Sequence, residues 1–319
     1  MPSEFQTHVL ALPSSAAGQR LDQALAAALP QYSRASLQRW IRAGAVRAAG
    51  RPVRARDRVQ GGEELVVEAR FAADTTIGPE ALPLEIVHED EALIVLNKPA
   101  GLVVHPGAGN RAHTLQNALL AHDPQLARVP RAGIVHRLDK DTSGLLVIAR
   151  TPEAHTRLVA ALAARAIGRE YLALCVGQPT GGARIDRPIG RHRSARTRMA
   201  VRGDGREAVT HYRIEERFRA HTLLRVRLET GRTHQIRVHL AHEGFPVVGD
   251  PVYGGRRRLL AGAGAALNAV LQGLRRQALH AQRLQLAHPS SGRALTFEAP
   301  VPADLEALLR LLRADAHEH

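Results

Sequence analysis

Residues 133–149 read Gly-Ile-Val-His-Arg-Leu-Asp-Lys-Asp-Thr-Ser-Gly-Leu-Leu-Val-Ile-Ala, a charged turn that runs into a continuous apolar segment. The apolar segment at 144–149 has the length of a strand and predicts one that is buried. Asp139 lies between two apolar runs, two residues after Arg137. A carboxylate beside a guanidinium, set between buried segments, is the first candidate for chemistry in this chain.

Length and composition bound the class of protein. The 319 residues are 45% hydrophobic, enough for one or two ordinary cores, and no apolar run is long enough to cross a bilayer. The first residues carry no basic leader, and Pro13 interrupts their apolar stretch, so we expect no secretory signal. The single cysteine, Cys175, excludes an internal disulfide and a multi-cysteine metal site. We expect a soluble cytoplasmic protein with no membrane partner.

Basic residues dominate the charge. The chain has 44 Lys and Arg against 30 Asp and Glu, a formal net charge of +14, which favours a polyanionic partner and above all nucleic acid. Only two of the basic residues are lysines, Lys98 and Lys140, and both lie in segments that carry motifs. An arginine presents a planar fork and a lysine a compact point charge, so these two positions are candidates for sites that do not accept the exchange.

The composition divides the chain near residue 75, and we predict domains over residues 1–75 and 76–319. In the first, two short helices are expected from residue 18 and over 32–42, with Ser33 as the N-cap of the second. Short strands at 44–53 and 64–68 follow. Between residues 34 and 58 there are eight arginines and one acid, a charge that suits contact with RNA phosphates.

The larger region alternates short strands with helices, and strands predominate. We expect a hairpin from residues 84–88 and 92–96, and a helix that Thr151 caps and that ends near residue 165. Further strands are expected at 144–149, 170–176, 209–218, 222–230, 279–286 and 294–298, and further helices at 233–242 and from 303. The pattern predicts an α+β fold, with a mainly antiparallel mixed sheet in the larger domain and a small N-terminal α/β domain.

Two other patterns suggest chemistry only weakly. Gly107-Ala-Gly-Asn-Arg-Ala112 has the spacing of a dinucleotide fingerprint, but Pro106 stands where a strand must enter the turn. His234, His239 and His242 share a predicted helix, yet no acidic or cysteine partner has metal-ligand spacing. We therefore expect neither a dinucleotide nor a metal at these positions.

A phosphatase is the strongest rival interpretation of the central motif. Asp139-Lys-Asp141-Thr142 has the Asp-x-Asp-x-Thr pattern in which the first aspartate of haloacid-dehalogenase-type phosphatases attacks phosphorus. In that fold an apolar strand leads directly into the first aspartate, whereas here His136 and Arg137 interrupt the run. Asp250 is the only candidate for a downstream metal-binding acid. A structural interpretation, in which both aspartates are turn residues, is also open for the motif alone.

Several ordered motifs together resemble the RluA family of RNA pseudouridine synthases. Residues 133–146 resemble its catalytic motif. The other matches are Leu96-Asn-Lys-Pro-Ala-Gly-Leu-Val-Val-His-Pro106, Arg169-Glu-Tyr-Leu-Ala173, Leu228-Glu-Thr-Gly-Arg-Thr-His-Gln-Ile-Arg-Val-His-Leu240, Val248-Gly-Asp-Pro-Val-Tyr-Gly254 and Arg276-Gln-Ala-Leu-His280. The resemblance covers most of residues 84–300, and so many ordered motifs at family spacing do not arise by accident.

Residues 18–68 resemble the S4 RNA-binding module, with Arg-Leu-Asp opening the first helix and Ser-Arg opening the second. One position departs from the pattern, because the tight turn has Ala49-Gly50 where the module usually has Asn-Gly. Asparagine tolerates a positive φ and alanine does not, so the sequence leaves the type of this turn open.

The resemblance implies a cofactor-free isomerisation of uridine to pseudouridine. Asp139 would be the nucleophile, attacking C1′ of the ribose or C6 of the uracil, and Arg237 its charge partner. Tyr171 would stack on the base near C5 and relay the C5 proton. The base must first leave its stack, at a cost of a few kcal/mol. The resemblance implies that Arg137 fills the vacated space in the RNA.

The combination of an S4-like module with this catalytic domain, and the segments at 104–110, 130–136 and 196–200, is most similar to the RluD branch of the family. Members of that branch modify the helix 69 stem-loop of 23S ribosomal RNA. We therefore expect 23S rRNA or the large ribosomal subunit as the partner of a monomer, with no metal or organic cofactor. The residues expected to contact RNA are His136, Arg137, Arg34, Arg39, Arg42, Arg191, Arg193, Arg196 and Arg198, the last four from a basic tract over residues 184–198.

Two further alternatives stay open. The enzyme could act on other uridines of 23S rRNA or on tRNA, or the chain could be an S4-type RNA-binding or ribosome-assembly factor with an inactive catalytic domain. The joint presence of Asp139, Tyr171 and Arg237 favours an active enzyme.

Overall fold

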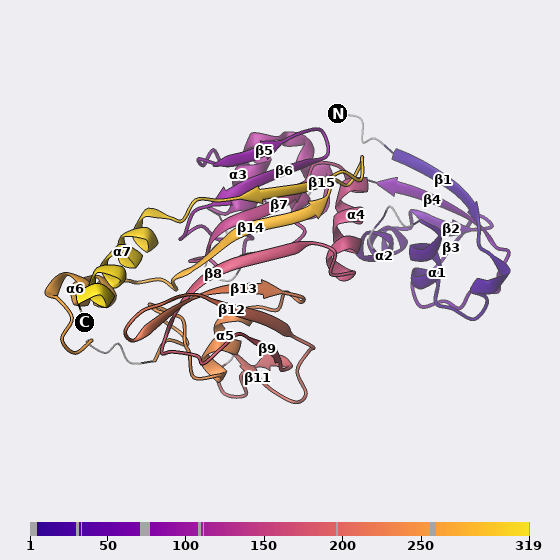
Figure 1. Ribbon diagram of the computed structural model, residues 1–319. Helices are drawn as coiled ribbons and strands as arrows, with labels where there is room; N and C mark the ends of the chain where they lie inside the picture. Colours follow the sequence, from indigo (N-terminus) through magenta and orange to yellow (C-terminus); the bar gives the residue numbers. More distant parts are fainter. Residues whose placement is uncertain are drawn as a thin grey trace.

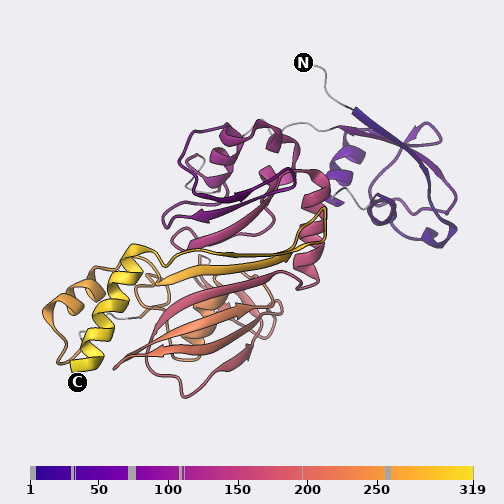
Figure 2. The same ribbon diagram turned by 45° about the horizontal axis from the view of Figure 1, so that its top comes forward.

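The computed structural model describes residues 5–29, 32, 34–70, 77–107, 110, 112–195, 197–255 and 260–318. They form an N-terminal unit with a four-stranded sheet and a larger unit with a nine-stranded sheet and a separate two-stranded hairpin. The N-terminal unit lies beside helix α4 (Pro152–Ala163) of the larger unit in both views (Figure 1, Figure 2). The predicted domain boundary near residue 75, the Ser33 cap and residues 108, 109 and 111 of segment 107–112 lie outside the described residues.

The N-terminal unit packs two helices against an antiparallel sheet of order β1-β4-β2-β3. Leu25 and Leu37 of the helices meet Val67 of the sheet in a core of their own, where all three are fully buried. The elements are β1 (Phe5–Ala11), α1 (Leu21–Ala28), α2 (Arg34–Arg42), β2 (Val46–Ala48), β3 (Arg51–Pro52) and β4 (Glu64–Arg70). Both predicted helices and the later strands are confirmed, whereas β1 was not predicted, because its partner β4 lies more than fifty residues away in the sequence.

A buried carboxylate joins the two helices. The side chain of Asp22 on α1 is completely buried and accepts hydrogen bonds from Arg20 (3.0 Å) and from Nε of Arg34 on α2 (2.9 Å). Burial raises the pKa of Asp22, but the hydrogen bonds from Arg20, Gln38 and Arg34 outweigh burial and hold the pKa at about 2. Arg34 is therefore engaged inside the unit, and the arginine fork fixes the angle between α1 and α2.

The tight turn between β2 and β3 keeps the geometry of an Asn-Gly turn although it contains alanine. Ala48 pairs with Arg51, and the two turn residues, Ala49 and Gly50, have φ values of 45° and 75°. Two consecutive positive φ angles in a two-residue hairpin loop define a type I′ turn. The turn type that the sequence left open is thus the usual one, and Ala49 is strained in it.

The larger unit is built on a sheet of order β5-β6-β7-β14-β8-β13-β12-β9, with β15 paired to β14. Only β7 and β14 run parallel, and the other pairs are antiparallel, as predicted. The strands are β5 (Ile86–Glu89), β6 (Leu93–Lys98), β7 (Ser143–Ala149), β8 (Gly168–Val176), β9 (Ala183–Asp186), β12 (Val209–Arg217), β13 (His221–Leu228), β14 (Leu279–Ala287) and β15 (Ala294–Glu298).

Strand β7 is buried on both faces because it separates two cores. Leu146 and Ile148 join one core together with side chains of α3 (Leu115–His122). Leu145 and Val147 point the other way and pack with side chains of α4. Alternation of side chains along a strand thus accounts for the continuous apolar run at 144–149.

The remaining elements cover the sheet and its ends. They are the hairpin of β10 (Ile189–Arg191) and β11 (Met199–Val201) and the helices α5 (Gln235–His242), α6 (Ala265–Gly273) and α7 (Ala303–Glu318). Helices α3 and α6, the 3-10 turns, and the strands β9 to β11 were not predicted. Thr151 caps α4 as predicted, because its side chain accepts from the backbone N–H of Ala154. Among the described residues no helix has the length and apolarity to span a membrane.

Replacing Ala49 by asparagine should stabilise the protein by about 0.5–1 kcal/mol, because asparagine occupies the left-handed region at lower cost than alanine. Urea denaturation of both proteins measures the difference in the free energy of unfolding. Ala48→Asn, one residue earlier and in the strand, is the control and should not stabilise. Equal effects of the two substitutions would contradict the strain at Ala49.

Candidate active site

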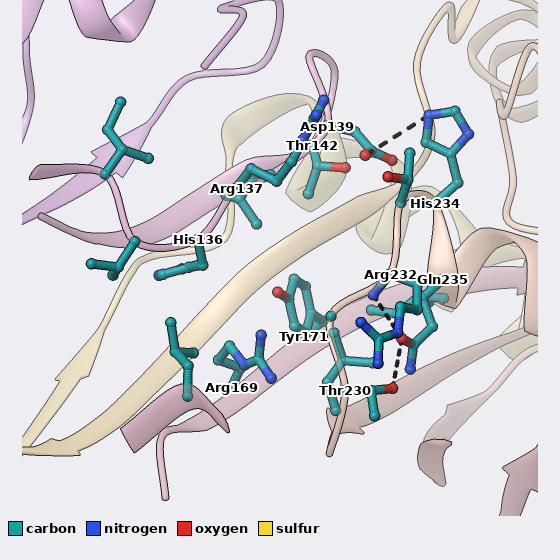
Figure 3. A pocket seen from close by; sticks show the side chains of 18 of the residues that line it. His136, Arg137, Asp139, Thr142, Arg169, Tyr171, Thr230, Arg232, His234 and Gln235 are labelled. Atoms are coloured by element: carbon teal, nitrogen blue, oxygen red, sulfur yellow. Dashed lines mark hydrogen bonds and ion pairs between the residues drawn. The ribbon is translucent and has the colours of Figure 1, made fainter. Parts of the chain in front are cut away.

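A cavity of about 890 Å³ opens beside Asp139 (Figure 3). Most of its lining residues come from three parts of the chain: the loop before β7, the start of β8 and the stretch that runs from the end of β13 into α5. The three residues predicted to carry the chemistry, Asp139, Tyr171 and Arg237, each come from a different one of these parts. The volume is in the range of sites that hold a small molecule or a single nucleotide base.

The turn that presents Asp139 is fixed from within and from the sheet. The N–H of Thr142 donates to the carbonyl of Asp139 (3.1 Å), and the buried Thr142 hydroxyl accepts from the side chain of Gln277 (3.0 Å). Gly144 follows with a φ of 113°, and a Cβ there would lie 2.2 Å from the carbonyl oxygen of Ala281. Only glycine allows the close parallel contact of β7 with β14 that holds this end of the turn.

Lys98 at the end of β6 supports the same turn from the other side. Its buried ammonium donates to three backbone carbonyls, those of Pro99 (2.7 Å), Leu102 (3.0 Å) and Lys140 (3.0 Å). Burial lowers the pKa of Lys98 to about 7, while the carboxylates of Asp141 and Asp139 act against this. A point charge with three donors fits three converging carbonyls, which accounts for a lysine in a chain that otherwise uses arginine.

Arg237 on α5 bridges two carboxylates. Its Nη1 donates to Oδ2 of Asp139 at 2.8 Å, and its Nε and Nη2 donate to the two oxygens of Asp250 at 2.7 and 2.9 Å. The exposed fractions of the three side chains are 5% for Arg237, 16% for Asp139 and 0% for Asp250. Burial lowers the pKa of Arg237, but the two carboxylates outweigh burial and raise it, so the guanidinium stays charged.

From the sequence, Asp250 was a candidate only as the metal-binding acid of a phosphatase, and its role beside Arg237 was missed. Besides Arg237 it binds the backbone N–H groups of Val252 (2.8 Å) and Tyr253 (3.0 Å) through Oδ1. Burial raises the pKa of Asp250, and the hydrogen bonds from Arg237 outweigh it, so the pKa falls below its usual value. The carboxylate is therefore ionised and saturated, and it orients the Arg237 fork toward Asp139.

A buried polar chain anchors α5. Gln235 accepts from the hydroxyl of Thr230 (2.8 Å) and donates to the carbonyl of Val209 and the hydroxyl of Thr210 (both 3.0 Å). Nδ1 of His239 pairs with Thr210 (2.8 Å), and its Nε2 lies 2.9 Å from the carbonyl of Arg187. Every member has a partner, so the network fixes the helix that carries Arg237.

His234 and Tyr253 close the side of the cavity next to Asp139. The hydroxyl of Tyr253 accepts from the N–H of Met199 and is hydrogen-bonded to Nδ1 of His234 at 2.9 Å. Nε2 of His234 lies 3.9 Å from Oδ1 of Asp139. The Arg237 guanidinium stacks 5.2 Å from the Tyr253 ring. Neither residue was predicted, because each depends on a contact between distant segments.

Tyr171 lies on β8 in the interior of the cavity and is 5% exposed. Burial raises its pKa, with the charge of Arg169 acting in the opposite direction. The phenol is thus neutral at physiological pH, and its ring offers an apolar face to a molecule that enters the cavity.

The residues expected to contact RNA fall into different settings. Arg137 is exposed at the cavity, and Arg39 and Arg42 are exposed on α2; within the described parts of the chain none of the three has an ion pair. His136 lines the cavity and accepts from the N–H of Val147. Arg34 is bound to Asp22 as described above. In the basic tract Arg191, Arg193 and Arg198 are exposed, Arg198 lying over the ring of Tyr253, and Arg196 is outside the described residues.

His239 and Asp250, which the sequence offered as metal ligands, are engaged in other contacts. No group of three or more metal-ligating side chains occurs in the part of the chain that the structure describes. His239 is a fully bonded core residue, and Asp250 is occupied by Arg237 instead of facing an ion. The Asp-x-Asp-x-Thr segment thus lacks the downstream acid that the phosphatase interpretation needs.

Comparison with known proteins identifies the class. Residues 92–242 match the RNA pseudouridylate synthase family and residues 19–65 match the S4 domain. Together with relatives that are more than half identical over nearly the whole chain, these matches show that the chain belongs to the RNA pseudouridine synthase family and is an RNA pseudouridine synthase. The predicted family, fold class and S4 module are confirmed.

The similar proteins include three bacterial ones named "Ribosomal large subunit pseudouridine synthase D". That of Xanthomonas campestris is 53% identical over 99% of this chain and 95% of its own length. Those of Escherichia coli (strain CFT073) and Pseudomonas aeruginosa are each 54% identical over 95% of this chain, covering 93% and 95% of their own lengths.

Two solved structures share the fold of the catalytic unit. Human RNA pseudouridylate synthase domain containing 4 is 26% identical with a TM-score of 0.57, covering 72% of this chain and 93% of its own. Human RNA pseudouridylate synthase domain containing 1 is 25% identical with a TM-score of 0.53, covering 73% and 95%.

Lys98→Arg should lower the free energy of unfolding by about 2–4 kcal/mol, because a planar guanidinium overfills the site and cannot satisfy three converging carbonyls. Chemical denaturation measures the change. Lys140→Arg is the matched control: this side chain is exposed, and we expect a change within about 0.5 kcal/mol. Similar losses in both variants would contradict the carbonyl cage.

His136 should make stability depend on pH. Burial, with the charge of Arg169, lowers its pKa to about 3, against the ordinary value of 6.5. Below pH 6.5 the unfolded chain therefore binds a proton that the folded protein does not, and stability falls with pH toward 3. Between pH 6.5 and 5 this contribution amounts to about 2 kcal/mol.

Urea denaturation of the wild type and His136→Gln across pH 5–7.5 isolates this contribution, because the other buried histidines are common to both proteins. The wild type should lose more stability than the variant as the pH falls. A difference between the two proteins that does not change with pH would show that His136 is not held neutral in the fold.

Proposed function

We propose that this enzyme isomerises uridines of large-subunit (23S) ribosomal RNA, in the helix 69 stem-loop, with Asp139 as the nucleophile. The observation that carries the proposal is the carboxylate of Asp139 in a cavity, 2.8 Å from a buried arginine, with Tyr171 lining the same cavity. The substrate class is supported by the bacterial relatives, whose shared name refers to the large ribosomal subunit.

The geometry supports a separate role for each of three side chains, Asp139, Arg237 and Tyr171. The ion pair with Arg237 holds the carboxylate of Asp139 in place beside the cavity, as an attack on C1′ or C6 requires. Tyr171 provides the stacking face for the flipped base and lies where its hydroxyl can relay the C5 proton.

RNA contact is supported by the distribution of exposed charge. Arg137 stands at the cavity next to the nucleophile, which suits a side chain that fills the space of a flipped base. Arg39 and Arg42 on the S4-like unit, and Arg193 and Arg198 on the basic tract, are exposed for contact with phosphates. We place the domain boundary at residues 75/76, and we expect a monomer in the cytoplasm, where ribosomal RNA is modified.

The test uses RNA that carries tritium at C5 of uridine, since isomerisation releases this hydrogen to water. Wild type should release tritium from a helix 69 stem-loop transcript and form pseudouridine in its nuclease digest. Asp139→Asn should reduce the single-turnover rate by at least about 10³-fold, because the amide is no nucleophile. RNA binding by the variant, measured by fluorescence anisotropy, should stay close to that of the wild type.

Asp141→Asn is the matched control, a carboxylate two residues away that the isomerase mechanism does not use and a phosphatase would need. Its rate should stay within about threefold of wild type. Product on another 23S stem-loop or on tRNA, but not on helix 69, would replace the target. Absence of product on free RNA and on ribosomal subunits would favour an inactive assembly factor, and Mg²⁺-dependent phosphate release would favour the phosphatase.

A further inference from the structure

One buried arginine in the cavity has no counter-charge. Arg169, near the start of β8, is 7% exposed, and within the described residues its guanidinium has neither a hydrogen bond nor an ion pair. Its Nε is completely buried. Arg237, equally buried, makes three hydrogen bonds to carboxylates. An unpaired buried charge costs stability, so its presence in a cavity indicates a partner that arrives with the substrate.

Arg169 directs its guanidinium into the part of the cavity where we expect the target base to bind, beside Tyr171. It stands two residues before Tyr171 on the same strand, so both side chains project from the same face, as Figure 3 shows. Both line the cavity. On the opposite wall Gly231 makes room for the guanidinium, because a Cβ there would lie 2.8 Å from Nη1 of Arg169.

A second donor without an acceptor lies on this side of the cavity. The N–H of Val147 donates to Nε2 of His136 at 3.3 Å, which places the proton of the neutral ring on Nδ1. Nδ1 is buried, and the described residues offer it no acceptor. The cavity thus presents a cation and a neutral N–H with nothing to accept from them, whereas uracil carries two carbonyl oxygens.

We propose that Arg169, assisted by His136, binds the carbonyl oxygens of the target uracil and stabilises the negative charge that the base acquires during the reaction. This inference rests on the proposed isomerisation. When N1–C1′ breaks, its electron pair passes to the uracil and spreads over N1, O2 and O4, while a carboxylate oxygen of Asp139 bonds to C1′. If Asp139 adds to C6 instead, the C5=C6 electron pair moves to O4.

Either route transfers the charge of the carboxylate to the uracil. In both, N1–C1′ is broken and C5 bonds to C1′, and the charge returns to Asp139 when its bond to the substrate breaks. C5 then releases its proton and N1 takes one up, so that no net charge or proton is gained. A fixed cation beside the uracil oxygens stabilises the intermediate more than the neutral substrate, which is the condition for faster chemistry. Arg169 is then a catalytic residue, and its lack of a carboxylate partner is what leaves it available.

The experiment compares Arg169→Met and Arg169→Lys with wild type in single-turnover reactions on two RNAs, one with uridine and one with 5-fluorouridine at the target. Fluorine withdraws electrons and makes the uracil anion more stable, so it reduces the need for the cation. Arg169→Met should lose about 10²-fold in rate on uridine but only about tenfold in the consumption of 5-fluorouridine. Arg169→Lys retains the charge and should lose about tenfold on uridine.

The melting temperature distinguishes a catalytic from a structural role of Arg169, because loss of a structural side chain would lower Tm. Arg169→Met removes an uncompensated charge and should raise Tm by about 2–4 °C. The matched control is Arg219→Met, outside the cavity, where the arginine binds the buried Asp315 through two hydrogen bonds of 3.0 Å. This variant should lower Tm and leave the rate unchanged.

Equal rate losses on the two RNAs overturn the inference, as does a lower Tm of Arg169→Met. A loss confined to RNA affinity, with the rate intact, also overturns it and indicates that Arg169 holds a phosphate. In these three cases the wild type still forms pseudouridine, and the proposed function stands. A wild type that forms none overturns the function and the inference together.

Discussion

The buried ion pairs of Arg237 with Asp250 and Asp139 set the geometry on which the site depends. Asp250 binds Nε and Nη2 of the guanidinium, and these two bonds fix the plane of the fork independently of Asp139. Only Nη1 remains for Asp139, and this single bond determines where the carboxylate lies. The two acids and one base leave a net negative charge, which is the charge that a nucleophilic carboxylate needs. Removing Asp250 would leave Nε and Nη2 of the buried guanidinium without acceptors, typically a loss of about 1–3 kcal/mol for each unsatisfied group.

The surrounding framework is made of contacts between distant segments, each ending on a backbone group next to the site. Lys98 reaches forward by more than forty residues to the carbonyl of Lys140, and Gln277 reaches back to Thr142. Gln235 ties the start of α5 to β12. Because these bonds are buried and fully paired, small displacements of Asp139 or Arg237 would leave polar groups unsatisfied. These paired hydrogen bonds make the site rigid, and they also make substitutions of its members destabilising.

The sequence alone predicted much of the regular structure, because alternation and caps are local signals. The strand at 144–149 and the Thr151 cap were predicted from residues that are neighbours in the chain. β1 was missed, because its only strand partner is β4. In the site, the resemblance indicated Asp139, Tyr171 and Arg237, but Asp250, His234 and Gln235 were missed. Their roles depend on which distant side chain each one meets, and no local pattern encodes that.

The buried cations Lys98, Arg237 and Arg169 differ in whether the fold supplies their hydrogen-bond acceptors. Lys98 has three carbonyl acceptors, and each nitrogen of the Arg237 guanidinium donates to an acid of the fold. Side chains bound in this way position their neighbours. Arg169 is equally buried and unsaturated within the described residues. A fold tolerates such a charge only where function recovers the cost, because any mutation that removed it would otherwise be favoured by stability. A buried cation without an acceptor in the fold, such as Arg169, is therefore the better candidate for contact with the substrate than a buried cation that is already paired.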